Sequence, residues 1–121
     1  MQPIEAVGQV TIQIIQQDTA DVDVLLIDAP GIEGYIIGRS DDGSSYQPDI
    51  DLSPYHAQSL GLSRRHAAFV HYRGYVHIMD LGSMNGTFVN GERLQPFDAY
   101  ALTSGDQINL ANLYIRVLQQ L

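Results

Sequence analysis

The sequence predicts an all-β protein built as an antiparallel β-sandwich. Short segments with a period of two recur along the chain, turn residues separate them at regular intervals, and no stretch has a convincing helical period. The chain has 121 residues, of which 45% are hydrophobic, so it can bury one core and is too short for two. We therefore expect a single domain over residues 1–121.

The first half of the chain is expected to contain four strands. The segments 10–14 and 22–27 begin with alternating apolar and polar residues. The segment 35–37 is apolar throughout and enters Gly38-Arg39, whereas 49–52 is brief and alternates again. Turn-forming polar residues fill the interval 40–48, which is therefore expected to be a loop.

Residues 53–61 have two interpretations. Ser53 can cap one or two helical turns, with Pro54 at the first helical position and Gly61 just past the end. An ordered loop accounts for the same residues equally well.

The second half of the chain is expected to consist of hairpins. Arg73-Gly74 is a two-residue turn, and Asn90-Gly91 is the strongest short hairpin signal that a sequence offers. Ala111-Asn112 joins the last two segments. The strands expected here are 67–72, 75–79, 87–89, 92–94, 107–110 and 113–118.

Charge and composition argue against several functions. The chain carries 14 acids against 6 bases, a net charge of −8, whereas a nucleic-acid-binding domain presents a basic face. Cysteine is absent, so disulfides and thiolate metal sites are excluded, and we expect no cofactor. No apolar run approaches the roughly 18 residues that span a bilayer, and the N-terminus lacks a basic leader. We expect a cytoplasmic protein with neither a nucleic-acid nor a membrane partner.

Three short motifs concentrate the polar chemistry of the chain. They are Gly38-Arg39-Ser40, Ser63-Arg64-Arg65-His66, and Asn85-Gly86-Thr87 followed by Asn90-Gly91. All 6 bases are arginines, and half of them lie in the first two motifs. Arginine forks, hydroxyl groups and turn backbone are the groups that hold a phosphate without breaking it.

In this order and spacing, the motifs resemble the forkhead-associated (FHA) domain. That family shows Gly-Arg after a strand, then Ser-x-x-His, then Asn-Gly-Thr followed closely by Asn-Gly; the stretch from Asp80 to Ser83 also has its usual form here. The resemblance implies a single FHA-like domain over 1–121 with a motif-bearing core at about 35–95. It implies an FHA/SMAD-like sandwich of about eleven strands, with the ligand loops at one end.

The resemblance also implies a function. FHA domains are non-catalytic modules that bind phosphothreonine, so the expected partner is a phosphothreonine-containing protein or peptide, such as a Ser/Thr kinase or its substrate. Arg39, Ser63 and Arg64 would contact the phosphate, and Asn85 would bind the main chain of the peptide. Met84 stands at a peptide-facing position where the family often has Thr, and a thioether cannot donate the hydrogen bond that Thr provides.

Other motif residues are expected to support the site. In the family, the histidine at the position of His66 braces the loops through internal hydrogen bonds. Thr87 is expected to be structural, and Asn90 to tie neighbouring loops together. Arg65 would point away from Arg64 if both entered a strand, so we expect it to be structural or solvated.

The residues also allow other interpretations. Arg39 could be a surface arginine paired with Asp41 or Asp42. The main alternative function is an FHA-like domain that binds a protein partner constitutively, without phosphate. Asp49 and Asp51 would share one face of a strand, most simply a solvated one.

An enzyme and a modification site are two further interpretations of the sequence. Ser63, His66 and Asp80 are the residue types of a hydrolase triad, but the chain has no Gly-x-Ser-x-Gly elbow, so we expect no enzyme. Thr19, within Asp18-Thr19-Ala20-Asp21, is a candidate phosphorylation site that would bind in trans to a second copy.

Overall fold

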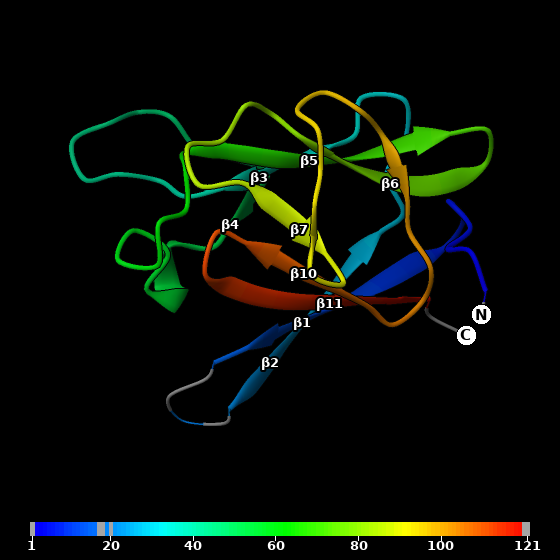
Figure 1. Ribbon diagram of the computed structural model, residues 1–121, viewed down its shortest axis with the longest axis horizontal. Coiled ribbons are helices and arrows are strands. Elements are labelled where there is room, and N and C mark those ends of the chain that lie inside the picture. The colour runs from blue at the N-terminus through cyan, green and yellow to red at the C-terminus, as the bar shows by residue number, and fades with distance from the viewer. Residues whose placement is uncertain (1, 17–18, 20, 120–121) are drawn as a thin grey trace.

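The computed structural model describes residues 2–16, 19 and 21–119, and within them the protein is all-β (Figure 1). Eleven strands and one three-residue 3-10 helix, η1, make up the regular structure of this part of the chain. The elements are β1 (Gln9–Ile15), β2 (Val22–Asp28), β3 (Tyr35–Gly38), β4 (Ile50–Asp51), η1 (Ser53–Tyr55), β5 (Arg65–Tyr72), β6 (Tyr75–Asp80), β7 (Thr87–Val89), β8 (Glu92–Arg93), β9 (Tyr100–Ala101), β10 (Asp106–Leu110) and β11 (Leu113–Gln119).

The strands form two sheets that pack face to face. One sheet has the order β2-β1-β11-β10-β7-β8 and the other has the order β4-β3-β5-β6-β9. Figure 1 shows β5 and β6 of the second sheet above β10 and β11 of the first. Pairing is antiparallel, as expected, except between β3 and β4, which run parallel over two residue pairs. The predicted β-sandwich is therefore confirmed, with one short parallel pair at its edge.

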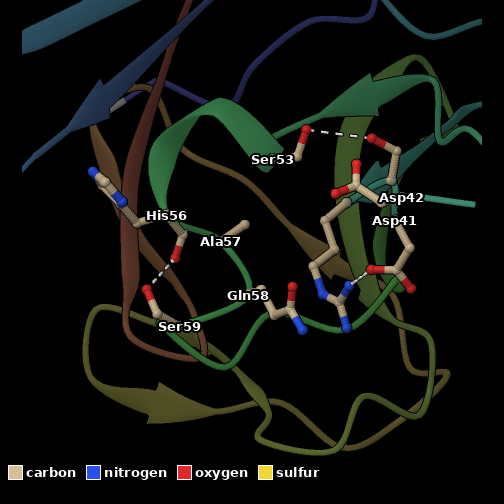
Figure 2. Close-up of a pocket in the computed structure, with 9 residues that line it drawn as sticks. Asp41, Asp42, Ser53, His56, Ala57, Gln58 and Ser59 are labelled. Carbon is tan, nitrogen blue, oxygen red and sulfur yellow. Dashed lines mark hydrogen bonds and ion pairs between the residues drawn. The ribbon is translucent and has the colours of Figure 1, made fainter.

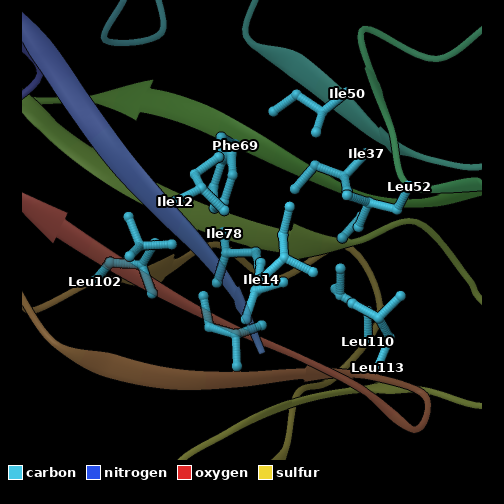
Figure 3. Packing of buried hydrophobic residues seen from close by; sticks show 14 of the residues in the cluster. Ile12, Ile14, Ile37, Ile50, Leu52, Phe69, Ile78, Leu102, Leu110 and Leu113 are labelled. Carbon is cyan, nitrogen blue, oxygen red and sulfur yellow. The ribbon is translucent and has the colours of Figure 1, made fainter. Parts of the chain in front are cut away.

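The core lies between the two sheets, and the period-two pattern of the sequence explains it. Alternate side chains of a strand point to opposite faces, so Val10, Ile12 and Ile14 of β1 are buried while the residues between them are not. Figure 3 shows Ile12 and Ile14 beside Phe69 and Ile78, which come from the opposite sheet. Burying one such side chain contributes about 1.5–3 kcal/mol.

One strand has no signal in the sequence. β9 comprises only Tyr100–Ala101, which pair with Ile78 and His77 of β6. Two residues are too few to show a periodicity, so only the neighbouring strand reveals this element. The ten other strands lie close to their expected positions.

The segment after β4 contains a single 3-10 turn. Pro54 lies within it as expected, but the cap position belongs to Leu52 and has no side-chain cap hydrogen bond, so the prediction of a Ser53 cap was wrong. Ser53 instead donates its backbone N–H to Asp51 at 3.0 Å. The helix ends at Tyr55, and its C-cap is His56, which has a left-handed φ of 58° and lies five positions before Gly61.

The loops that follow β3, precede β5 and precede β7, which carry Arg39, Ser63-Arg64 and Asn85, gather at one end of the sandwich. In Figure 1 these loops lie at the left, and the end of β11 lies at the right. Thr19 is exposed in the β1–β2 connection, whereas its neighbours Asp18 and Ala20 lie outside the described residues. No part of the described chain forms a helix long and apolar enough to cross a membrane.

Candidate functional site

Residues from all three motifs meet at one cleft of about 720 Å³. The loop after β3 contributes Arg39, the segment before β5 contributes Ser63 and Arg64, and the loop before β7 contributes Met84 and Asn85. The other lining residues are Tyr46, Gln58, Gly61, Leu62 and Arg65. The structure therefore brings together all five residues that the sequence assigned to phosphate and peptide contact.

Arg39 is held on two sides of its guanidinium group. Its Nε donates a 2.7 Å hydrogen bond to the carbonyl oxygen of Leu62, and its Nη1 pairs with the carboxylate of Asp41. The side chain is only 16% exposed. The ion pair with Asp41 that the sequence allowed therefore exists, and Arg39 nevertheless lines the cleft.

Arg64 and Arg65 both line the cleft, although alternation along a strand would separate them. β5 begins at Arg65, so Arg64 precedes the strand and the alternation argument does not apply to the pair. The side chain of Arg64 is 58% exposed, and its Nε lies 3.7 Å from a carboxylate oxygen of Asp41. The cleft thus carries three arginines within a strongly acidic chain.

Asp49 is exposed, as the expected solvated face requires, and Asp51 is half-buried, but both carboxylates also accept backbone hydrogen bonds. Asp51 accepts hydrogen bonds from the backbone N–H and the hydroxyl of Ser40 and from the backbone N–H of Ser53. Asp49 accepts the backbone N–H of Ile36 at 2.8 Å. Burial alone would raise the pKa of Asp51, but these hydrogen bonds to the charged form outweigh it, and the pKa is lowered. Asp51 therefore fixes the chain immediately after Arg39.

His66 joins the second motif to the third. It is fully buried, its Nδ1 accepts the backbone N–H of Ser63 at 3.0 Å, and its Nε2 lies 2.8 Å from the carbonyl oxygen of Gly86. Because Nδ1 accepts a hydrogen bond, the proton of the neutral ring lies on Nε2, which donates to Gly86. Burial lowers the pKa of His66, although the Gly86 carbonyl and the charge of Asp80 oppose the shift.

We expect the stability of the protein to fall as the pH drops from about 7.5 to about 5, through the range in which an unfolded histidine becomes protonated. The lowered pKa means that the unfolded state binds a proton at His66 more readily than the folded state, so acid favours unfolding. Urea denaturation across this range measures the slope. His66→Phe should flatten the slope, whereas His71→Gln, at an exposed residue, should leave it unchanged. Equal slopes of unfolding free energy against pH in wild type and both variants would contradict the assignment of this pH dependence to His66.

Asp80 organises the loop that carries the third motif. One of its carboxylate oxygens accepts the hydroxyls of Ser83 and Thr87, at 2.6 and 2.7 Å, and the other accepts the backbone N–H groups of Gly82 and Ser83. Burial by itself would raise the pKa of Asp80, but the hydrogen bonds lower it below the usual value. Thr87 is fully buried beside it. Asp80 is recognisable in the sequence as part of the motif, but its bracing role depends on contacts that only the folded loop creates.

The triad residue types do not form a catalytic relay. Ser63 Oγ accepts the backbone N–H of Met84 at 3.1 Å, both ring nitrogens of His66 are hydrogen-bonded to backbone groups, and Asp80 bonds to its own loop. A general base needs a free ring nitrogen within reach of the nucleophile. This arrangement positions the Ser63 hydroxyl without activating it.

The remaining motif residues differ in where they lie. Asn85 is exposed at the cleft, where its Nδ2 donates to the carbonyl oxygen of Gly61 at 2.9 Å, and Met84 is 84% exposed. Asn90 bonds through its side chain to Asp106 and Gln107, none of which lines the cleft. Its role is to tie the β7–β8 turn to β10.

Comparison with known proteins identifies the same region. The family model described as FHA domain matches residues 35–111. The oxoglutarate dehydrogenase inhibitor of Corynebacterium glutamicum is 43% identical over 76 residues, which are 63% of this chain and 49% of that protein. The glycogen accumulation regulator GarA of Mycolicibacterium smegmatis is 32% identical over 76 residues, which are 63% of this chain and 44% of that protein. The match thus spans less than half of these relatives.

A solved structure extends the likeness to nearly the whole chain. It comes from a structural and functional analysis of phosphothreonine-dependent FHA domain interactions, and it superposes with a TM-score of 0.65 at 28% sequence identity. The superposition covers 94% of this chain and 99% of that one.

Proposed function

This chain belongs to the FHA-domain family of protein-interaction modules, and from that premise we propose that it binds phosphothreonine in partner proteins. The observation that carries the proposal is the meeting of Arg39, Ser63 and Arg64, from two separate loops, at one cleft. A relative studied for phosphothreonine-dependent interactions supports it. The module would recruit or regulate proteins modified by a Ser/Thr kinase, without catalysing a reaction itself.

The cleft groups suit a phosphate dianion. A phosphate presents three acceptor oxygens and needs several donors at once. Arg39 and Arg64 supply charged N–H groups. The oxygen of the Ser63 hydroxyl accepts a hydrogen bond from the backbone N–H of Met84. Its proton has no acceptor among the described residues and is therefore available to the ligand. Asn85 stands beside them with one amide N–H and its oxygen available for peptide main chain.

We expect Arg39→Ala to weaken phosphothreonine-peptide binding about ten- to a hundredfold, because a charge-assisted hydrogen bond contributes about 1.5–3 kcal/mol. The probe is a degenerate peptide library with a fixed phosphothreonine, followed by titration of the tightest sequence by calorimetry. Ser63→Ala should weaken binding as well, since the hydroxyl donor is lost.

The matched control for this experiment is Arg73→Ala. It removes the same charge from the exposed β5–β6 turn, and Arg73 does not line the cleft. Its affinity should stay within about twofold of wild type, because exposed charges beyond about 8 Å are screened at physiological salt. If both arginine variants weaken binding equally, the effect is one of net charge and the proposed site is wrong.

A second candidate function is constitutive binding through the outer face of the first sheet. Val22, Val24 and Leu26 alternate along the edge strand β2 and are 49%, 58% and 52% exposed. An exposed apolar row on an edge strand is a typical protein-contact surface, and none of these residues lines the cleft. Equal capture of phosphorylated and unphosphorylated libraries, lost in Val24→Ser but not in Arg39→Ala, would favour this function over the first.

A further inference from the structure

An internal carboxylate already contacts both cleft arginines proposed to hold the phosphate. Asp41 follows Arg39 by two residues; its Oδ1 pairs with Nη1 of Arg39, and its Oδ2 lies 3.7 Å from Nε of Arg64. In Figure 2 the dashed line at Asp41 marks its pair with Arg39, at the edge of a hollow of about 430 Å³ that adjoins the cleft through Arg39 and Gln58. The Asp41 side chain is 29% exposed and lines this hollow, so solvent can take it up when a ligand displaces it from the arginines.

We propose that Asp41 is an internal competitor that makes the cleft selective for a phosphate dianion over peptide carboxylates. The inference rests on the proposed function and adds to it a residue that determines specificity. A ligand must displace Asp41 from Arg39 and Arg64 before it can take both of them.

The selectivity follows from the charges exchanged. A Glu or Asp side chain of a peptide carries one negative charge and two oxygens. When it displaces Asp41 from the arginines, one carboxylate contact is exchanged for an equivalent one. A phosphothreonine carries about −1.5 to −2 charges at pH 7 and three strong acceptor oxygens, so the same exchange gains charge and hydrogen bonds. A peptide carboxylate can bind the two arginines only by breaking both Asp41 contacts, whereas a phosphate also bonds to the Ser63 hydroxyl and can bind while Asp41 keeps one of them. Asp41 therefore penalises the carboxylate more than the phosphate.

Arg39 does not depend on Asp41 for its orientation. Its Nε donates to the Leu62 carbonyl oxygen at 2.7 Å, and its backbone N–H donates to the carbonyl oxygen of Arg64 at 3.2 Å. Asp51 independently fixes Ser40 through two hydrogen bonds. Asp41 can therefore leave by rotating its own side chain, while the guanidinium group stays in place.

The chain supplies a matched control at the next position. Asp42 lines the same hollow and carries the same charge, and among the described residues its carboxylate has neither an ion pair nor a hydrogen bond. Asp41→Asn and Asp42→Asn change the net charge equally, so any difference between them reports the contact with the two arginines.

The test measures the affinity of wild type, Asp41→Asn and Asp42→Asn for two peptides. Both carry the tightest library sequence, one with phosphothreonine and one with Glu at that position. We expect Asp41→Asn to bind the Glu peptide about three- to tenfold more tightly than Asp42→Asn does. The affinity for the phosphothreonine peptide should also rise in Asp41→Asn, but by less, because the phosphate reaches further donors that the Glu side chain does not. The ratio of the two affinities, and with it the preference for phosphate, should therefore decrease.

Three outcomes are distinct. Equal affinities of Asp41→Asn and Asp42→Asn for the Glu peptide would overturn the competitor role of Asp41, while leaving the proposal of phosphothreonine binding intact. A loss of affinity in Asp41→Asn would also overturn it, and would make Asp41 a positioning residue for Arg39. If no variant binds phosphothreonine peptide more tightly than the unphosphorylated sequence, the proposed function itself fails. If the competitor role is right, Arg39→Ala in the Asp41→Asn background abolishes the gain in affinity for the Glu peptide.

Discussion

Replacing Gly38 with alanine is expected to lower the unfolding free energy by about 3 kcal/mol and Tm by about 10 °C. A Cβ atom at this buried position would overlap the backbone carbonyl of Arg64, which unlike a flexible side chain cannot move aside. The pairing of β3 with β5 changes register at this point, between Ile37 and Gly38, and this brings the chain so close. Scanning calorimetry or urea denaturation measures the loss.

The control for this prediction is Gly31→Ala. Open space surrounds the position where its Cβ would lie, and its φ is not in the left-handed region, so the substitution should change stability by less than about 0.5 kcal/mol. Similar Tm values for Gly38→Ala and Gly31→Ala would contradict the close approach of Gly38 to the Arg64 backbone.

The consequence of the close approach reaches the cleft. Gly38 precedes Arg39, whose backbone N–H donates to that same Arg64 carbonyl oxygen at 3.2 Å. In any Gly38→Ala protein that still folds, the backbone at residue 38 must move away from the backbone of Arg64. This movement also separates Arg39 from Arg64. We therefore expect the folded fraction of this variant to bind phosphothreonine peptide more weakly, whereas Gly31→Ala should bind as wild type does.

Asp80→Asn is expected to destabilise the protein by about 3 kcal/mol at pH 7. Asp80 is 2% exposed and its carboxylate accepts four hydrogen bonds, so an amide would turn two N–H donors toward groups that also donate. Urea denaturation compares the variant with wild type. Asp98→Asn, at an exposed residue, is the control and should change stability by less than about 0.5 kcal/mol.

The difference between wild type and Asp80→Asn should shrink in acid. The folded pKa of Asp80 lies below its usual value of 3.8, so the carboxylate contributes its full stabilisation above about pH 5 and loses it as the pH falls through the folded pKa. Measurements at pH 7 and pH 3 test the sign. A difference that stays constant, or grows at pH 3, would show that the loop does not depend on the ionised carboxylate.

Features that depend on neighbours in the sequence were predicted without the structure. The alternation of Val10, Ile12 and Ile14 marks a strand with one buried face, because side chains along a strand point to opposite sides whatever lies around them. The turn at Asn90-Gly91 is equally local: both residues adopt positive φ, 51° and 87°, which Asn and Gly tolerate best. The order of the three motifs, read along the chain, indicated the family.

The contacts that complete the cleft could only come from the tertiary structure. Leu62 holds Arg39 from 23 positions away, and His66 reaches Gly86 across 20. Such pairs meet because the register of β3, β5 and β7 within the two sheets sets their distance, and no local propensity encodes it. The same holds for Asp41. Whether its carboxylate faces solvent or contacts both arginines depends on how closely the loop after β3 approaches the segment before β5. Local sterics and turn chemistry thus decided the strands, whereas strand register decided which charges face each other.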